Sequence, residues 1–206
     1  MIYDISPPLS PDTAVFPGDT PLSREVLLDL ARGDGLTLST LRSTVHLGAH
    51  ADGPNHYALR GRSVDEQPLE RYLGRCQVVA CASKPSMRLE PADLLAPISE
   101  PRVLLKTGSW PDPTTFNRDF VGLAVGLVSF LADAGVRTIG IDTPSVDLAD
   151  SQDLPAHHAI FEHDIAILEC LDLAEVPPGS YELIALPLKL VGFDASPVRA
   201  ILRSLQ

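Results

Sequence analysis

Cysteine is scarce in this chain of 206 residues, which contains only Cys76, Cys81 and Cys170. Their number is odd, and no two of them are spaced as Cys-x-x-Cys. Each lies in or beside an apolar, strand-like run, where free cysteine is commonly buried. A Cys–His nucleophile is the alternative, but we expect buried structural thiols in a reducing compartment.

Basic residues are also few, with 16 Lys and Arg against 27 Asp and Glu, and the formal net charge is −11. This balance argues against nucleic acid or an anionic membrane as a partner. The chain has no apolar run long enough to cross a bilayer. Its first residues, Met-Ile-Tyr-Asp-Ile, lack the basic and then apolar pattern of a secretory signal. We therefore expect a cytoplasmic protein.

The remaining composition is ordinary for a globular protein, with 45% hydrophobic and 21% charged residues. No internal repeat or linker is visible, so we expect a single domain over residues 1–206. The apolar patterns predict strands over residues 2–6, 24–30, 36–45, 77–81, 102–106, 137–142, 164–169 and 181–190. They predict helices over residues 68–73, 90–95, 123–134 and 155–163. The order strand, helix, strand between 102 and 142 indicates a parallel crossover and an α/β fold; residues 197–205 are compatible with strand or helix.

The most informative stretch reads His-Leu-Gly-Ala-His-Ala-Asp-Gly-Pro-Asn-His from His46 to His56. His46, His50, Asp52 and His56 stand at even spacing, which places them on one face of an extended chain. Histidine nitrogens and carboxylate oxygens are the usual ligands of zinc and similar divalent metals. The run therefore predicts a metal site.

A fully extended segment from His46 to His56 would span roughly 33 Å. No single metal site is that wide, so the run must curl. Gly48, Gly53 and Pro54 are the positions where the chain is able to bend. We interpret residues 46–52 as the end of a strand and residues 53–56 as a turn that folds His56 back over the site. For His56 a ligand, an acid/base and a structural role are all open, and we favour acid/base.

The other three histidines form a second cluster at His157, His158 and His163, close to Glu162 and Glu169. Glu169 ends an apolar strand-like run and is expected to point into a site. Asp52, two histidines of the first run, one histidine of the second and Glu169 would form two metal sites that share a bridge. The residues alone do not decide between His157 and His158. We expect a surface position for His163 and a solvated one for Glu162, and we leave open whether the polar loop 142–147 contacts a ligand.

These features resemble the bacterial kynurenine formamidase (arylformamidase) family, within the wider metal-dependent cyclase/hydrolase superfamily. The superfamily motif His-x-Gly-Thr-His-x-Asp-x-Pro-x-His matches residues 46–56, with Ala49 in place of threonine. Five further segments look like the formamidase branch, so that the similarity covers nearly the whole chain: residues 17–21, 154–158, 166–169, 181–188 and 195–200.

The resemblance implies a swivelling β/β/α fold with a mixed sheet and flanking helices, a homodimer, and two zinc ions per subunit. It implies that one metal is held by His46, His50 and Asp52, and that Asp52 bridges to the other. It favours His157 as the partner of Glu169, because the family places this histidine twelve residues before its glutamate.

By the same resemblance, His56 corresponds to the general acid/base. Phe16 stands where the family usually has a tryptophan that contacts the substrate through its backbone carbonyl, so Phe16 is the candidate substrate-binding residue. The implied reaction is hydrolysis of N-formyl-L-kynurenine to L-kynurenine and formate in tryptophan degradation by the kynurenine pathway. Two alternatives stay open: a related hydrolase acting on a cyclic amide such as isatin, and a metal-binding protein without catalysis.

Overall fold

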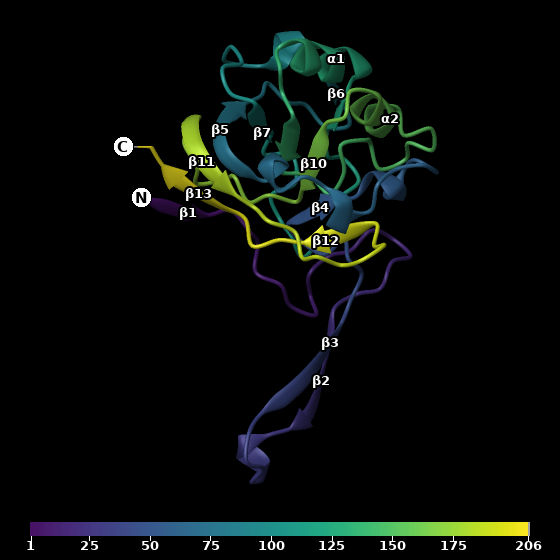
Figure 1. The fold of residues 1–206 in the computed structure, drawn as a ribbon, viewed down its shortest axis with the longest axis vertical. Helices are drawn as coiled ribbons and strands as arrows, with labels where there is room; N and C mark the ends of the chain where they lie inside the picture. Colours follow the sequence, from purple (N-terminus) through teal and green to yellow (C-terminus); the bar gives the residue numbers. More distant parts are fainter. Residues whose placement is uncertain (206) are drawn as a thin grey trace.

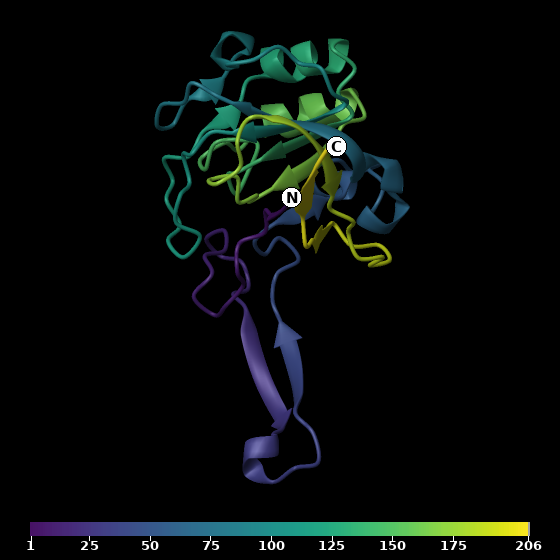
Figure 2. The same cartoon turned by 90° about the vertical axis from the view of Figure 1, so that its left-hand side faces the viewer.

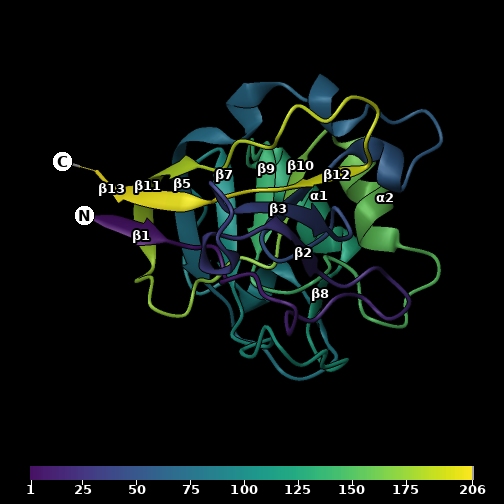
Figure 3. The ribbon, with the colours of Figure 1, turned by 90° about the horizontal axis from the view of Figure 1, so that it is seen from below.

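The computed structural model describes residues 1–205, and nine strands in that range form one mixed sheet (Figure 1). In chain order these strands are β1 (Ile2–Asp4), β4 (His50–Asp52), β5 (Leu73–Ala80), β7 (Arg102–Lys106), β9 (Thr138–Ile141), β10 (Ala166–Glu169), β11 (Gly179–Ile184), β12 (Ala195–Pro197) and β13 (Ile201–Ser204). Across the sheet their order is β1-β13-β11-β5-β7-β9-β10-β4-β12. Since β1 pairs with β13, the two ends of the chain lie side by side at one edge (Figure 3).

The middle of the sheet is parallel and both of its flanks are antiparallel. Strands β5, β7, β9 and β10 run parallel to one another, whereas β11 pairs antiparallel with β5, and β4 pairs antiparallel with both β10 and β12. Helix α1 (Val125–Asp133) connects β7 to β9, and α2 (Pro155–Glu162) connects β9 to β10. Both helices cover the same face of the sheet (Figure 2). The predicted parallel crossover and the α/β class, a mixed sheet with flanking helices, are therefore confirmed.

Apolar alternation along the strands builds a core on each face of the sheet. In β7, Val103 and Leu105 pack under the helices, while Leu104 packs on the opposite face. All three side chains are fully buried. Helix α1 ends as predicted, because Gly135 takes a left-handed conformation with φ of +84° just after it.

Several short elements differ from the sequence-based predictions. The helices expected over 68–73 and 90–95 are single 3₁₀ turns, at Leu69–Arg71 and Pro91–Asp93. The strand expected over 181–190 ends at Ile184, before Pro187 interrupts it. The C-terminal segment 197–205, which is compatible with strand or helix, contains strand β13.

A two-stranded sheet joins β6 (Arg88–Leu89) and β8 (Gly122–Leu123). Further 3₁₀ turns lie at Leu30–Arg32, Pro54–His56 and Val64–Glu66. No helix in the described part of the chain is both long and apolar enough to cross a bilayer.

A long hairpin projects away from this body (Figures 1 and 2). It consists of β2 (Ser23–Leu28) and β3 (Leu38–Arg42), which pair antiparallel, and we call residues 23–42 the arm. The strand predicted over 36–45 is shorter in the structure, where β3 covers only Leu38–Arg42. Residues 43–49, which connect it to β4, have no regular structure.

The interpretation of residues 46–52 as one strand end is wrong, since only residues 50–52 belong to β4. The cause is Gly48, which has a positive φ of +55° and thereby breaks the extended conformation. A Cβ atom at this position would lie 2.4 Å from Cδ2 of Leu9. The even-spacing rule therefore does not extend across Gly48, and His46 reaches the site from a bend instead of a strand. Pro54–His56 forms the expected turn.

Candidate metal centre

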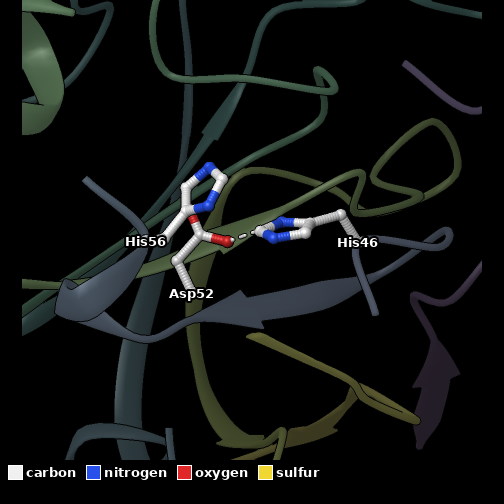
Figure 4. A group of neighbouring side chains, drawn as sticks. All are labelled: His46, Asp52 and His56. Carbon is white, nitrogen blue, oxygen red and sulfur yellow. Dashed lines mark ion pairs between the residues drawn. The ribbon is translucent and has the colours of Figure 1, made fainter. Parts of the chain in front are cut away.

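The carboxylate of Asp52 lies at the centre of the site, at the end of β4 and only 2% exposed. Its Oδ1 atom lies 3.2 Å from Nδ1 of His46 and 3.4 Å from Nε2 of His50. Figure 4 shows the His46 ring pointing at this carboxylate, with the ring of His56 beside it. Two imidazole nitrogens therefore converge on one oxygen of Asp52.

The second oxygen of Asp52 faces side chains from the other half of the chain. Its Oδ2 atom lies 3.8 Å from Nε2 of His157, and the same nitrogen lies 3.8 Å from Oε1 of Glu169. The other oxygen of Glu169 lies 3.2 Å from Nε2 of His50. Asp52 thus stands between two groups of donor atoms.

Sheet pairing explains why residues more than a hundred positions apart meet here. Strands β4 and β10 are antiparallel, and Glu169 stands directly opposite His50. Directly opposed residues of an antiparallel pair present their side chains on the same face. Helix α2 lies between β9 and β10 in the chain and adds His157 from its first turn.

The buried polar atoms at this site fit metal ions. Nε2 of His50 and both carboxylate oxygens of Asp52 are buried and have no hydrogen-bond partner among the described residues. Such atoms are costly to bury unless they are paired or coordinate a metal. Two sets of donor atoms lie mutually within 4.8 Å, one from His46, Asp52 and His56 and the other from His50, Asp52 and Glu169. Imidazole and carboxylate donors in this number suit zinc and similar divalent ions.

The structure fixes which nitrogen of each buried histidine is free for a metal. Nδ1 of His50 donates to the carbonyl of Gly48 at 2.8 Å, and Nδ1 of His157 donates to Oδ2 of Asp147 at 2.8 Å. Both rings therefore present Nε2 to Asp52. Hydrogen bonds of this kind commonly hold metal-binding histidines in one tautomer.

Asp147 is a site residue that the sequence did not single out, although it lies in the loop 142–147 whose role was left open. It is fully buried and also accepts hydrogen bonds from Nη1 of Arg88 at 2.6 Å and from the backbone nitrogen of His157 at 3.1 Å. Burial would raise the pKa of Asp147, but its bonds to His157 and Arg88 lower it to about 2. Asp142, at the other end of the loop, instead accepts hydrogen bonds from the backbone nitrogen and the hydroxyl group of Thr107.

Charge at the site follows from these contacts. Burial alone would raise the pKa of Asp52, but the surrounding imidazoles hold it well below its usual range. Burial opposes protonation of His157, yet Asp147 and Asp52 raise its pKa to about 10. The pKa of His50 is likewise raised against the effect of burial, mainly by Asp52. Metal ions must displace protons from such rings, so metal binding here releases protons.

His56 occupies the rim of the site and is less enclosed than the other donors. Its side chain is 38% exposed, and its ring centroid lies 4.2 Å from that of His46. Burial lowers the pKa of His56, which favours a neutral ring. Of the three roles considered above, this position fits the acid/base and the metal-ligand roles, since His56 lines the cavity and lies beside His46 and Asp52.

A cavity of about 460 Å³ opens over these donors. Phe16 lines it, is 41% exposed, and packs edge-on against Phe116 with ring centroids 5.0 Å apart. Phe16 therefore belongs to the wall of the cavity and not to the core. Cys170 also lines the cavity, next to Glu169, and has an unusual positive φ of +53°. All three cysteines are free thiols.

The remaining residues of the second histidine cluster lie outside the site. His157 is 3% exposed and faces Asp52, whereas His158, on the next position of α2, is exposed. His163 and Glu162 are exposed as well. The structure thus separates two adjacent histidines that the residue pattern alone does not distinguish.

Comparison with known proteins identifies similar sequences and folds. The Cyclase family model matches residues 3–148. A solved structure described as a potential metal-dependent hydrolase with cyclase activity is 28% identical, has a TM-score of 0.85, and the match covers 98% of this chain and 96% of that one. A protein described as a predicted metal-dependent hydrolase from Bacillus stearothermophilus is 28% identical, with a TM-score of 0.82 and coverage of 98% and 97%.

A third similar structure is isatin hydrolase A from Labrenzia aggregata, which is 24% identical. Its TM-score is 0.83, and the match covers 100% of this chain and 94% of that one. At this identity the similarity establishes a common fold.

Proposed function

The chain belongs to the Cyclase family, and from that premise we propose that it is a metal-dependent hydrolase that cleaves amides attached to aromatic rings, with N-formyl-L-kynurenine as its substrate. The observation that carries the proposal is the buried carboxylate of Asp52, which stands between two groups of donors and has no hydrogen-bond partner among the described residues. We propose two zinc ions per subunit, bridged by Asp52. His46 and His50 would hold one, and His157 and Glu169 the other.

When bound, divalent metals lower the pKa of water towards neutrality and act as Lewis acids on a carbonyl oxygen. The chain's own contribution is to fix the donors before substrate arrives. Gly48 and Asp147 each hold one imidazole in a single tautomer through hydrogen bonds of 2.8 Å. This rigidity limits the reorganisation that the site requires during the reaction.

His56 is the proposed proton carrier. Hydrolysis adds water to the formyl carbon and breaks the bond between that carbon and the aromatic amine nitrogen, which yields formate and the free amine. The departing nitrogen needs a proton, and a neutral imidazole is suited to take one from water and deliver it to the amine. Because His56 lines the cavity and is partly exposed, it has access to a bound substrate.

The aromatic part of the substrate would lie against Phe16 and Phe116. Their edge-to-face pair forms an apolar wall on one side of the cavity. Aromatic rings favour such offset or edge-on contacts. Phe16 offers a smaller ring than tryptophan, but a contact through its backbone carbonyl does not depend on the side chain.

A cyclic aromatic amide such as isatin is the second candidate substrate. No lysine or arginine is among the described residues that line the cavity, so neither a lysine nor an arginine would pair there with the carboxylate of N-formylkynurenine. Isatin carries no such charge. A structurally similar protein is named isatin hydrolase.

The decisive test measures metal content per chain and hydrolysis of both substrates on the same purified sample. We expect two zinc ions per chain and formation of kynurenine from N-formylkynurenine. Turnover of isatin alone would replace the proposed substrate with the second candidate. A metal-loaded protein that hydrolyses neither would overturn the proposal and leave a metal-binding protein without this catalysis.

Adjacent histidines on α2 provide a matched control. His157→Ala removes a buried donor beside Asp52, whereas His158→Ala alters an exposed ring. We expect His157→Ala to lower metal content and activity together, while His158→Ala retains both. Equal effects of the two substitutions would contradict the assignment of His157.

A further inference from the structure

A second carboxylate, Asp194, joins two histidines on the outer side of the site. Its Oδ2 atom accepts a hydrogen bond from Nε2 of His46 at 3.0 Å. The same oxygen lies 3.6 Å from Nδ1 of His56. Nothing in the residue pattern around Asp194 indicates a role in the site, because it lies 148 residues after His46.

The backbone around Asp194 is firmly attached to the segment that carries His56. The carbonyl oxygen of Asp194 accepts a hydrogen bond from the backbone nitrogen of Gly53 at 2.8 Å, one residue before the Pro54–His56 turn. The next residue, Ala195, begins β12 and pairs with Asp52. The side chain of Asp194 is therefore placed by the same strands that place Asp52, although it is itself 47% exposed.

We propose that Asp194 is a positioning residue that orients His56 for proton transfer, and this inference rests on the proposed function. With Nδ1 directed at Asp194, the ring leaves Nε2 for the cavity that it lines. The separation of 3.6 Å is slightly long for a hydrogen bond, and bonds between catalytic groups commonly shorten when substrate binds. A carboxylate behind an imidazole also stabilises the protonated ring.

The proton balance of the step is complete. Nε2 of His56 takes a proton from the attacking water, and the ring is then positively charged while Nδ1–H faces Asp194. As the bond between carbon and nitrogen breaks, the same proton passes to the amine nitrogen, and the ring returns to its neutral form. Asp194 exchanges no proton and stays ionised throughout.

The alternative is that Asp194 only stabilises the segment that carries it and does not orient His56. The two roles differ in how the rate depends on the leaving amine of the substrate. An amine of low basicity departs without full protonation, so its release depends little on a well-oriented acid. A basic amine depends on that acid strongly. A general disturbance of the site would slow the hydrolysis of both kinds of formamide by the same factor.

The test uses metal-saturated protein and two formanilides, with a para-methoxy or a para-nitro substituent. We expect Asp194→Asn to lower kcat/KM for the methoxy compound by about 10- to 100-fold, the usual effect of removing such a partner. The nitro compound should be nearly unaffected. An equal loss for both compounds would overturn the proposal, as would no loss for either.

A second measurement asks whether Asp194 acts through His56. In a His56→Ala background, Asp194→Asn should cost no further activity towards the methoxy compound, since the residue that it positions is absent. The full cost of Asp194→Asn in that background would show that it acts through His46 instead, and would overturn the inference.

Asp65 provides the matched control for the loop. Its carboxylate accepts a hydrogen bond from the backbone nitrogen of Gly192 at 3.0 Å, so it anchors the same segment without contacting either histidine. Asp65→Asn should leave the ratio of the two rates unchanged, and a ratio altered as in Asp194→Asn would assign the effect to the loop. If the wild-type protein hydrolyses no aryl formamide, the proposed function itself fails, which is distinct from failure of the role of Asp194.

Discussion

The metal centre and the arm are incomplete in opposite ways. At the centre, polar atoms of His50 and Asp52 are buried and have no hydrogen-bond partner in residues 1–205. In the arm, large apolar side chains are exposed: Leu27, Leu28, Leu30, Leu36, Leu38 and Leu41 are each at least 38% accessible. A buried polar atom is costly unless it binds a metal ion or another polar group. A large exposed apolar surface is typical of a site where another molecule packs.

We therefore expect each region to be completed by something outside the single chain. An isolated two-stranded hairpin is at best marginally stable in water, and the arm extends well clear of the body (Figure 2). The homodimer remains a prediction, and the arm is the segment where we expect a second copy to pack. The centre, in contrast, is expected to be completed by metal ions alone.

The largest effect is expected from Asp52→Asn. The substitution removes the charge that would bridge two cations and replaces one oxygen with an amide group that does not ligate well. We expect loss of metal and a fall in activity of at least about 10³-fold, as for removal of a central catalytic group. Metal analysis and a hydrolysis assay check this. Circular dichroism must show an intact fold, and a fully active variant would contradict the central place of Asp52.

Metal removal is expected to have the next largest effect. Ions that bind only the folded chain stabilise it, by about 2.7 kcal/mol at a concentration of 100 times Kd. For a chain of this size this corresponds to a fall in Tm of roughly 5–10 °C on chelation. Thermal unfolding with and without a chelator measures the shift, and added zinc should reverse it. An unchanged Tm would mean that the buried donors do not hold a metal.

A smaller effect is expected from Gly48→Ala, compared with Gly35→Ala in the arm. At Gly48 the new side chain would meet a positive φ and Cδ2 of Leu9, whereas a Cβ atom at Gly35 would have no atom of the described residues within 4 Å beyond its own chain neighbours. Strain of this kind costs about 1–3 kcal/mol. We expect Gly48→Ala to lower both Tm and metal affinity, because Gly48 also accepts the hydrogen bond of His50. Similar effects at the two glycines would remove the contrast between centre and arm.

The smallest effect on the stability of the single chain is expected from the double substitution Leu38→Ser and Leu41→Ser. Both leucines are exposed in the arm, so their loss should change the free energy of unfolding by less than about 0.5 kcal/mol per site. The molar mass in solution should nevertheless fall towards that of a monomer. Light scattering or sedimentation measures this, and a wild-type protein that is monomeric at high concentration would refute the expected dimer contact.

Several features that depend on residues close together in the sequence were predicted correctly. Strand 102–106 and the helix before Gly135 follow from apolar periodicity and a glycine signal, and both are present. The donor types around Asp52 were also readable, because imidazoles and carboxylates in such density have few other uses. The bend at Gly48 was named as one of three options, but nothing local determined that it would separate His46 from β4.

Contacts between distant segments were not predictable in this way. Asp194 contacts His46 because β12 pairs with β4. No sequence pattern near residue 194 predicts that pairing. Asp147 lies ten residues before His157, but it also pairs with Arg88, which comes from a separate element. Such partners are set by the order of strands in the sheet, which local sequence does not specify.

The position of β4 has a consequence for synthesis on the ribosome. The chain emerges from its N-terminus, so His50 and Asp52 appear more than a hundred residues before Glu169, the residue that faces them. At a translation rate of about 5–20 residues per second, this interval lasts roughly 6–24 s. During that time His50 and Asp52 are present without Glu169, so we expect the complete metal site to form only after Glu169 has emerged.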